Sequence, residues 1–200
     1  MTSKPSDLRP EPETVAAKPL KIVIAGGFAA GKTTFVDSIS EITPLTTEAQ
    51  MTSHSIGVDN PGEVSTKTTT TVAMDFGRIT LSDTMLYLFG TPGQDRFWFM
   101  WDELSKGAVG AVVLVDTRRL GDCFPALDYF EAKQLPYVVV LNTFDGKLSH
   151  PPDEVREACA IEREIPILMV DARDRTSTKD ALVALVRHAI SRKLARTPVS

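Results

Sequence analysis

The chain has 200 residues, of which 42% are hydrophobic and 24% charged, and its formal net charge is −4. This composition suits one globular domain with a full core, and the acidic balance gives no basis for non-specific nucleic-acid binding. The two cysteines, Cys123 and Cys159, lie too far apart for a zinc motif or a disulfide framework. The longest apolar run, 108–115, is too short to span a bilayer. We therefore expect a cytoplasmic protein without direct membrane insertion, which reaches a membrane only through partners.

The two ends of the chain differ in composition from the rest. Residues 1–19 contain four prolines and few apolar side chains, and such a segment cannot bury enough surface to order itself. We expect a flexible tail over 1–19, one domain over 20–193 and a short C-terminal tail over 194–200.

The strongest motif lies at residues 21–34, KIVIAGGFAAGKTT. It fits G-x-x-x-x-G-K-[ST], with Gly26 as the first glycine and Gly31-Lys32-Thr33 at the end. The apolar run before it predicts a buried parallel strand, and residues 33–42 predict a helix. A glycine loop between strand and helix presents backbone N–H groups to a phosphate. Lys32 would reach the outer phosphates and the Thr33 hydroxyl would bind Mg²⁺; an ordinary glycine turn is the alternative.

A long polar stretch, 43–70, follows the first predicted helix and is rich in Thr and Ser. A loop of this length within a compact domain is usually functional or disordered, and we expect a functional loop. Residues 72–80 and 85–89 predict an antiparallel hairpin at a sheet edge, with its turn at 81–84.

The segment after this hairpin combines a turn sequence with several aromatic residues. Gly90-Thr91-Pro92-Gly93-Gln94 is followed by Phe97-Trp98-Phe99-Met100-Trp101. The first part has the composition of a turn. The aromatic side chains predict either core packing or a partner surface, and the sequence favours neither.

The rest of the chain alternates strands with helices. Strands are predicted at 107–116, 136–141 and 165–170, and helices at 123–133, 153–163 and 178–193. This alternation predicts an α/β fold with a mostly parallel sheet covered on both faces. Ligands bind such sheets at the carboxyl ends of the strands, where each of these motifs falls.

The ordered set of motifs resembles the Ras-like small GTPases over residues 20 to about 193. More closely, it is similar to the bacterial MglA-like group and to actinobacterial conservon-type GTP-binding proteins. The motifs are GGFAAGKTT, TTTTVAMDFG, FGTPGQDRFWFMWDEL, VVLVD and LNTFDG. The resemblance implies a three-layer P-loop NTPase fold, with a mostly parallel six-stranded sheet and one antiparallel edge strand.

Asn142 and Asp145 resemble the pair that reads guanine in this family. A carboxylate can accept two hydrogen bonds from the N1–H and N2–H₂ groups of guanine, whereas adenine offers no such donor pair. An Asx-type turn is the alternative. The family has Lys at the position of Thr143, which has no aliphatic stem to cover the base. Ala172 matches the residue whose backbone N–H contacts the guanine oxygen.

By the same resemblance, Gln94 would orient the attacking water and Gly93 would meet the γ-phosphate. Thr71 is chosen from the run 68–71 as the Mg²⁺-sensing threonine, because it directly precedes a strand. The resulting catalytic residues are Gln94 and Lys32, and the metal ligands are Thr33 and Thr71. The nucleotide-binding set comprises Gly26, Gly27, Phe28, Ala29, Ala30, Gly31, Lys32, Thr33, Thr34, Thr71, Gly93, Asn142, Thr143, Asp145 and Ala172.

Three positions depart from the Ras-like pattern. Gly90 replaces an aspartate that holds a water on Mg²⁺, a difference that MglA-like proteins share, and Asp116 is a candidate to compensate. Phe28 replaces a glycine of the phosphate loop. Thr70 stands where MglA-like proteins can supply an arginine, for which Arg96 and Lys67 are candidate substitutes.

These observations predict a switch that binds GTP or GDP with Mg²⁺ and hydrolyses GTP slowly. The resemblance implies a Roadblock/LC7-type regulator and a sensor-kinase-like membrane complex as partners. One alternative is a guanine-nucleotide-binding scaffold module with little or no hydrolysis, favoured by Gly90 and Phe28. Another is an ATP-using P-loop kinase, which would need a cluster of lid arginines that the sequence does not display.

Overall fold

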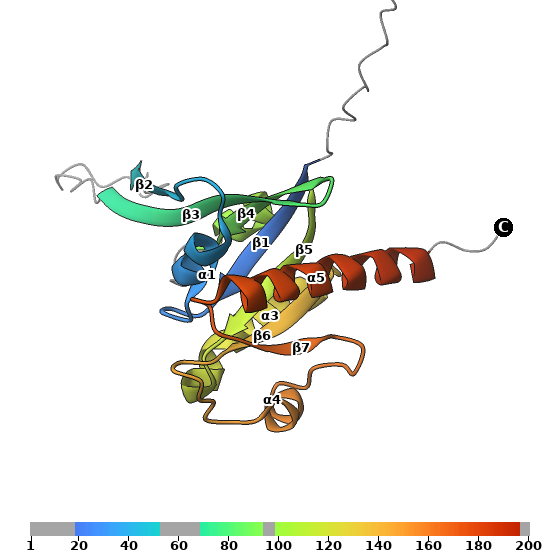
Figure 1. Ribbon diagram of the computed structural model, residues 1–200. Coiled ribbons are helices and arrows are strands. Elements are labelled where there is room, and N and C mark those ends of the chain that lie inside the picture. The colour runs from blue at the N-terminus through green and yellow to red at the C-terminus, as the bar shows by residue number, and fades with distance from the viewer. Residues whose placement is uncertain (1–18, 53–68, 94–98, 197–200) are drawn as a thin grey trace, which may run out of the picture.

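The computed structural model describes residues 19–52, 69–93 and 99–196. The described ranges leave out residues 1–18 of the predicted tail over 1–19, most of the predicted loop, Gln94 with residues 95–98, and the last four residues. Among the described residues, seven strands form one sheet in the order β2-β3-β4-β1-β5-β6-β7 (Figure 1). The strands are β1 (Leu20–Gly26), β2 (Leu45–Thr52), β3 (Thr69–Leu81), β4 (Thr84–Gly90), β5 (Ala108–Val115), β6 (Tyr137–Asn142) and β7 (Ile167–Val170).

The helices cover both faces of this sheet, which gives a three-layer arrangement. They are α1 (Lys32–Ile39), α2 (Phe99–Ser105), the 3₁₀ helix η2 (Thr117–Cys123), α3 (Phe124–Ala132), α4 (Pro152–Ala158) and α5 (Arg175–Arg196). Side chains of α1 and α5 form one core with Ile22 and Ile24 of β1. Val23 and Ala25 face the opposite core, which contains side chains of α2, α3 and α4. Because β1 is buried on both faces, its sequence is continuously apolar.

The α/β fold class predicted from the sequence is confirmed, and the strand pairing fits the Ras-like P-loop fold. β1 pairs in parallel with β4 and β5, and β5, β6 and β7 continue in parallel. β3 runs antiparallel to both β4 and β2. The predicted sheet has six strands, with the antiparallel strand at its edge. Among the described residues the sheet has a seventh strand, β2, which occupies that edge, so the antiparallel strand β3 is second from the edge.

β2 and the start of β3 lie within the stretch that was predicted as a loop, so that prediction was wrong for these residues. The register pairs Leu45 with Phe76 and Thr52 with Thr69. In the sequence of β2, LTTEAQMT, apolar residues stand only at alternate positions, 45, 49 and 51, and every residue between them in that alternation is polar. This period of two was the available signal for a strand, although threonines and the charged Glu48 make the segment polar as a whole.

One other prediction, on the far side of the sheet, was wrong in its bounds. The helix predicted over 153–163 ends at Ala158, and Ala160 adopts a left-handed conformation with φ of 51°. Arg156 then holds the following turn by donating to the carbonyl oxygens of Glu162 and Ile165, at 2.6 and 3.1 Å. A left-handed residue just after a helix ends it without a glycine.

The aromatic segment that begins α2 divides between core and surface. Trp101 is buried and stacks on Phe130 of α3, with ring centroids 5.9 Å apart. Phe99 is exposed, and Phe97 and Trp98 lie outside the described residues. Core packing is therefore the correct interpretation for Trp101.

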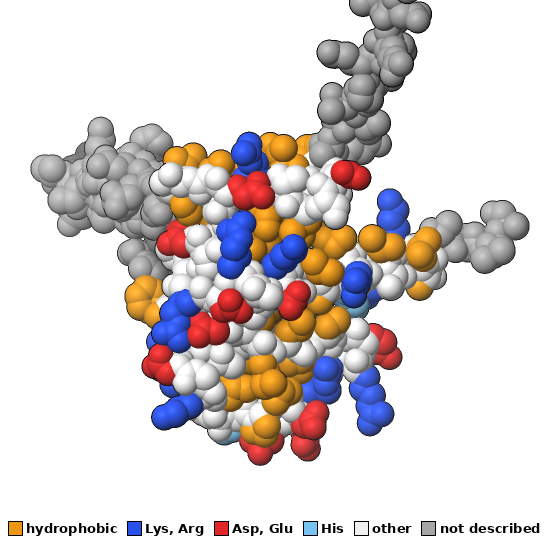
Figure 2. Space-filling model, viewed as in Figure 1, with side chains coloured by type: hydrophobic (Ala, Val, Ile, Leu, Met, Phe, Trp, Pro, Cys, Tyr) orange, Lys and Arg blue, Asp and Glu red, His pale blue; other side chains and the backbone are white. Residues whose placement is uncertain are grey.

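The surface on the α5 side carries charges of both signs. Acidic and basic side chains are interspersed over the face seen in Figure 2, and apolar side chains show along the projecting end of α5. Ile190 and Leu194 are exposed there. Among the described helices, none is long and apolar enough to cross a membrane.

Candidate functional site

The predicted phosphate loop joins the end of β1 to the start of α1. Gly26 and Gly31 have φ of 144° and 102°. A Cβ on Gly26 would lie 2.3 Å from the carbonyl oxygen of Leu114, and one on Gly31 would lie 2.4 Å from Asn142 Nδ2. Glycine is therefore required at both positions. Gly31 is the N-cap of α1 and provides no side-chain cap, so the first N–H groups of the helix could bind an anion.

Lys32 is folded back over this loop. Its Nζ donates to the carbonyl oxygens of Gly26 and Gly27, at 3.0 and 2.7 Å, and only 8% of the residue is exposed. Burial lowers the pKa of Lys32 to about 8, against the opposing effect of the Asp75 charge. A Cβ on Gly93 would lie 2.8 Å from the same Nζ, so the segment after β4 reaches the ammonium group directly.

Asp75 of β3 is the acidic residue beside Thr33 at the start of α1. Its carboxylate is buried and accepts a hydrogen bond of 2.8 Å from the Thr33 hydroxyl. A Cβ on Gly90 would lie 3.0 Å from Asp75 Cβ and 3.1 Å from its Oδ2. Asp75 therefore fills the space beside Gly90, where Ras-like proteins have their aspartate. The pKa of Asp37 on α1 is raised, first by the burial of Asp37 and second by the negative charge of Asp75.

This donor set fits a magnesium ion. Mg²⁺ prefers hard oxygen ligands and is usually held by one or two carboxylates or hydroxyls together with phosphate oxygens. Thr33 and Asp75 bring a hydroxyl and a carboxylate together. Among the described residues, no group of three or more His, Cys, Asp or Glu could hold a metal by itself. Nucleotide oxygens would have to complete such a site.

Asp116, the candidate to replace the missing acid, has a different role. Its carboxylate accepts hydrogen bonds from Arg118 Nε and Nη2, at 2.8 and 2.7 Å, and from the Arg118 backbone N–H. These bonds hold the pKa of Asp116 below its usual range despite its burial. The Asp116 carboxylate is therefore bonded to Arg118. The acidic side chain that lies beside Thr33 is that of Asp75.

Asn142, at the end of β6, connects the phosphate loop to the loop after β7. Its Nδ2 donates to the carbonyl oxygen of Ala30 at 3.0 Å, and its Oδ1 accepts from the backbone N–H of Ala172 at 3.1 Å. Both residues and Asn142 itself are buried. The amide side chain thus fixes the two loops relative to each other, and the Ala172 N–H already has an acceptor.

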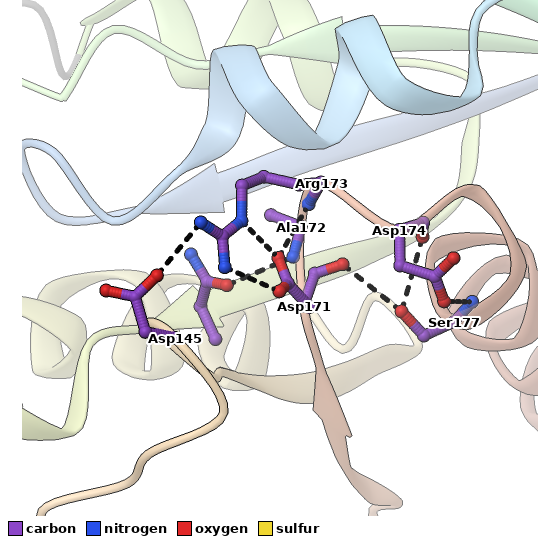
Figure 3. A network of polar contacts seen from close by, with 7 residues as sticks. Asp145, Asp171, Ala172, Arg173, Asp174 and Ser177 are labelled. Carbon is purple, nitrogen blue, oxygen red and sulfur yellow. Dashed lines mark hydrogen bonds and ion pairs between the residues drawn. The ribbon is translucent and has the colours of Figure 1, made fainter.

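Asp145 is presented on the surface beside these loops. The residue has a left-handed φ of 54°, and 83% of its side chain is exposed. Its Oδ1 accepts a hydrogen bond of 3.0 Å from Arg173 Nη1. Figure 3 shows the Arg173 guanidinium between the carboxylates of Asp145 and Asp171. Thr143, between Asn142 and Asp145, is half-buried and donates its backbone N–H to Val170.

The same Asp-x-Arg arrangement occurs at the ends of β5 and β7, on either side of β6. Arg173 donates from Nε and Nη2 to the two oxygens of Asp171, at 2.9 and 2.8 Å, and its backbone N–H also bonds Oδ1. These bonds lower the pKa of Asp171 to about 2. They repeat the contacts between Arg118 and Asp116. The Arg118 guanidinium lies 3.9 Å from the ring centroid of Phe144.

The loop after β7 is also fixed to the start of α5. Asp174 accepts from the backbone N–H of Ser177 at 2.9 Å, and the Ser177 hydroxyl donates to the Asp171 carbonyl oxygen at 3.1 Å (Figure 3). Arg173 therefore projects from a backbone that is held on both sides. Rigid support of this kind is what a recognition side chain requires.

A family model covers most of this chain. It is described as a conserved hypothetical ATP binding protein and matches residues 24–192. The chain belongs to this family. An uncharacterized protein of Methanocaldococcus jannaschii is 30% identical over 128 residues, which cover 63% of the chain and 71% of that protein.

Ras-related proteins are similar to this family member as well. Rab-7b of Bos taurus is 32% identical over 126 residues, covering 57% of the chain and 62% of that protein. Rab-32C of Dictyostelium discoideum is 26% identical over 182 residues, covering 84% of the chain and 72% of that protein. The resemblance recognised in the sequence is supported as that of a small GTPase-like P-loop protein.

The structure brings most of the predicted residues of this family member to one edge of the sheet. The loop 26–31, Lys32, Thr33 and Gly93 lie together, and Asn142 joins them to Ala172. Phe28 and Thr34 are exposed beside them. Thr71 lies in β3, where its backbone pairs with Gln50 of β2, but its side chain lies outside what the structure describes, as do Gln94, Arg96 and Lys67.

Sequence reasoning missed two features of the site. Asp75 lies in a predicted strand, within TTTTVAMDFG, and its acidic side chain among apolar neighbours was the available signal. The two Asp-x-Arg pairs directly follow apolar strands, in VLVDTR and LMVDAR, and this repetition could also have been found.

Binding of a nucleoside diphosphate is expected to become weaker above pH 8 and to take up protons there. Lys32 has a pKa of about 8 in the free protein, and contact with phosphate would raise that pKa because it favours the charged form. Between these two values the complex holds a proton that the free protein has lost, so affinity falls by up to about tenfold per pH unit. Calorimetry at pH 8.5 in buffers of different ionisation enthalpy measures the uptake; no uptake would contradict this role of Lys32.

Proposed function

We propose that this protein is a guanine-nucleotide-binding switch that hydrolyses GTP to GDP and phosphate slowly, under the control of partners. The family match and the similarity to Rab proteins support the general part of this proposal, a nucleotide-binding protein related to nucleotide hydrolases. The finer assignment to guanine is supported mainly by Asp145. Its exposed carboxylate lies on a loop that Asn142 fixes to the phosphate loop, and guanine offers the two donors that a carboxylate accepts.

The proposed reaction is attack of water on the γ-phosphorus with loss of GDP. Lys32 would leave its two loop carbonyls and bind the outer phosphates, and the N–H groups at the start of α1 would hold the phosphate oxygens. Thr33 and Asp75 would hold Mg²⁺, which offsets negative charge on the phosphates when it is bound. Gln94 would orient the water, and Thr71 would sense the ion.

The switch would act through the segments on either side of the phosphate site. In this proposal the segments 43–71 and 91–105 contact the phosphate site when GTP is bound, and hydrolysis releases them from it. Membership in the MglA-like or conservon-type group belongs to the proposal. So do a Roadblock/LC7-type regulator, a sensor-kinase-like complex at the membrane, and a cytoplasmic location.

A scaffold that binds guanine nucleotide with little or no hydrolysis is the second candidate. The exposed Phe28 in the phosphate loop favours it, because a bulky residue there occupies space near the reacting phosphate. Multiple-turnover phosphate release, measured with and without candidate partners, separates the two functions.

The family description names ATP, so the choice of base requires a direct test. Labelled GDP and ADP should be titrated against the purified protein, and the nucleotide released on denaturation should be identified. Tighter binding of GDP supports the proposal, whereas equal or tighter binding of ADP would contradict it.

Asp75→Asn is expected to weaken Mg²⁺ binding in the nucleotide complex by about 10–100-fold, because residues that support a metal site typically contribute that much. A magnesium titration of GDP dissociation measures the effect. Asp83→Asn, the same change in the turn between β3 and β4, is the matched control.

A compensating variant sharpens this test. Gly90→Asp alone would be crowded, because a Cβ there would lie 3.0 Å from Asp75 Cβ. Combined with Asp75→Gly, which removes that Cβ, it would move the carboxylate from β3 to β4 and should restore much of the metal affinity. Unchanged magnesium dependence in a stably folded Asp75→Asn protein would contradict the assignment.

A further inference from the structure

Asp145 and Arg173 together present an ordered row of acceptors and donors at the base end of the site. Asp145 Oδ1 accepts from Arg173 Nη1 at 3.0 Å, and Oδ2 accepts no hydrogen bond from the described residues. Arg173 uses three of its five side-chain N–H groups in its bonds to Asp171 and Asp145. A second N–H on Nη1 therefore remains beside the carboxylate.

This row has the pattern that guanine requires. The Watson–Crick edge of guanine presents the N2–H₂ donor, the N1–H donor and the O6 acceptor in sequence. The carboxylate of Asp145 offers two acceptors, and Nη1 of Arg173 offers the donor next to them. Cytosine pairs with guanine through the same acceptor–acceptor–donor order. Adenine presents an acceptor at N1 and a donor at N6, which oppose this order.

The donor expected for O6 from the family resemblance is already in use. The backbone N–H of Ala172 donates to Asn142 Oδ1 at 3.1 Å, and Ala172 is 1% exposed. Asn142 is in turn fixed to the phosphate loop through Ala30. Moving the Ala172 N–H to a base would break this connection between the two loops, whereas Arg173 can donate without breaking any bond.

Arg173 is also positioned in advance. Asp171 holds its guanidinium side-on, and Asp174 and Ser177 fix the backbone that carries both residues (Figure 3). Its side chain is nevertheless 58% exposed, so a base can reach it. A planar guanidinium held in this way is the side chain that most often donates to guanine O6.

We propose that Arg173 is a second base-reading residue, which donates to O6 of guanine while Asp145 accepts from N1–H and N2–H₂. The inference rests on the proposed function and extends it from one reading side chain to two. It makes the Arg173–Asp145 ion pair part of the bound state, rather than a contact that the nucleotide must displace.

The test compares GDP with 6-thio-GDP, in which sulfur, a weaker acceptor, replaces O6 while N1–H and N2–H₂ remain. Unmutated protein should bind GDP about 3- to 10-fold more tightly, the value of one hydrogen bond. In Arg173→Ala this ratio should fall to about 1. Arg173→Lys, which keeps the charge but loses the planar fork, should lower the ratio as well and serves if the alanine variant does not fold.

Arg118→Ala is the matched control, because Arg118 has the same contacts to Asp116 but lies over Phe144. It should keep the ratio of the two affinities. If folded Arg173→Ala and Arg173→Lys keep the ratio of the unmutated protein, the inference is overturned while guanine binding stands. If the unmutated protein binds ADP as well as GDP, the proposed function fails and the inference fails with it.

Discussion

Asp145→Asn is expected to weaken GDP binding by about 2–5 kcal/mol, as happens when a charged partner of buried hydrogen bonds is lost. Asp145 is exposed in the free protein, but a bound base would cover it. An asparagine offers one acceptor and one donor in place of two acceptors. Xanthine keeps N1–H and has an oxygen in place of the N2 amine, so xanthosine diphosphate should bind the variant better than GDP does.

Competition of GDP, xanthosine diphosphate and ADP against a fluorescent GDP analogue measures this change of preference. Asp153→Asn, which makes the same substitution at an exposed position on α4, should leave all three affinities unchanged. A variant that loses GDP without gaining xanthosine diphosphate would mean that Asp145 supports the loop rather than reading the base.

Much of the fold follows from local constraints that a sequence displays. Strands such as β1, β5 and β6 are buried on both faces, which forces continuous apolar runs that are easy to recognise. The phosphate loop is recognisable because Gly26 and Gly31 have no space for a side chain. In each case burial or lack of space restricts which residue type can stand at the position, so the restriction is visible in the sequence.

The features that were missed depend on partners distant in the sequence. β2 is defined by its pairing with β3 across an intervening segment. Asp75 acquires its place from Thr33, 42 residues earlier, and from the absence of a side chain at Gly90. In the sequence Asp116 is an equally reasonable acid, but its carboxylate is bonded to Arg118. The order of residues along the chain does not distinguish a carboxylate beside a proposed metal site from a carboxylate that is bonded to an arginine.

The two ends of the proposed site have different mechanical support. At the base end, Asn142, Asp171 and Asp174 fix the loops through bonds between neighbouring strands and α5. At the phosphate end, the hydrogen bonds of Lys32 to described residues go to carbonyls of its own loop, and Lys32 approaches Gly93. We therefore expect base recognition to be preorganised, and changes on nucleotide binding to begin at the phosphate end.

Very slow hydrolysis of GTP by the isolated protein is the result expected at that phosphate end. Phe28 is 61% exposed, and a Cβ on Gly93 would lie 3.2 Å from Phe28 Cα. Gln94 follows Gly93, so the phenyl group is expected to crowd the glutamine and to block an arginine inserted by a partner. Ras-like proteins without such an arginine turn over at roughly 10⁻⁴ s⁻¹, and the arginine adds about 10³–10⁵.

Single-turnover hydrolysis by the unmutated protein, Phe28→Gly and Gln94→Ala tests this account. We expect any activating partner to act by repositioning Gln94, so Gln94→Ala should lose the stimulated rate, and Phe28→Gly should make the site accessible to an added arginine. Phe124→Ala removes another exposed phenyl group outside the phosphate loop and should change neither rate. Rapid hydrolysis by the unmutated protein alone would refute the crowding argument, and so would a Gln94→Ala variant that keeps its full stimulated rate.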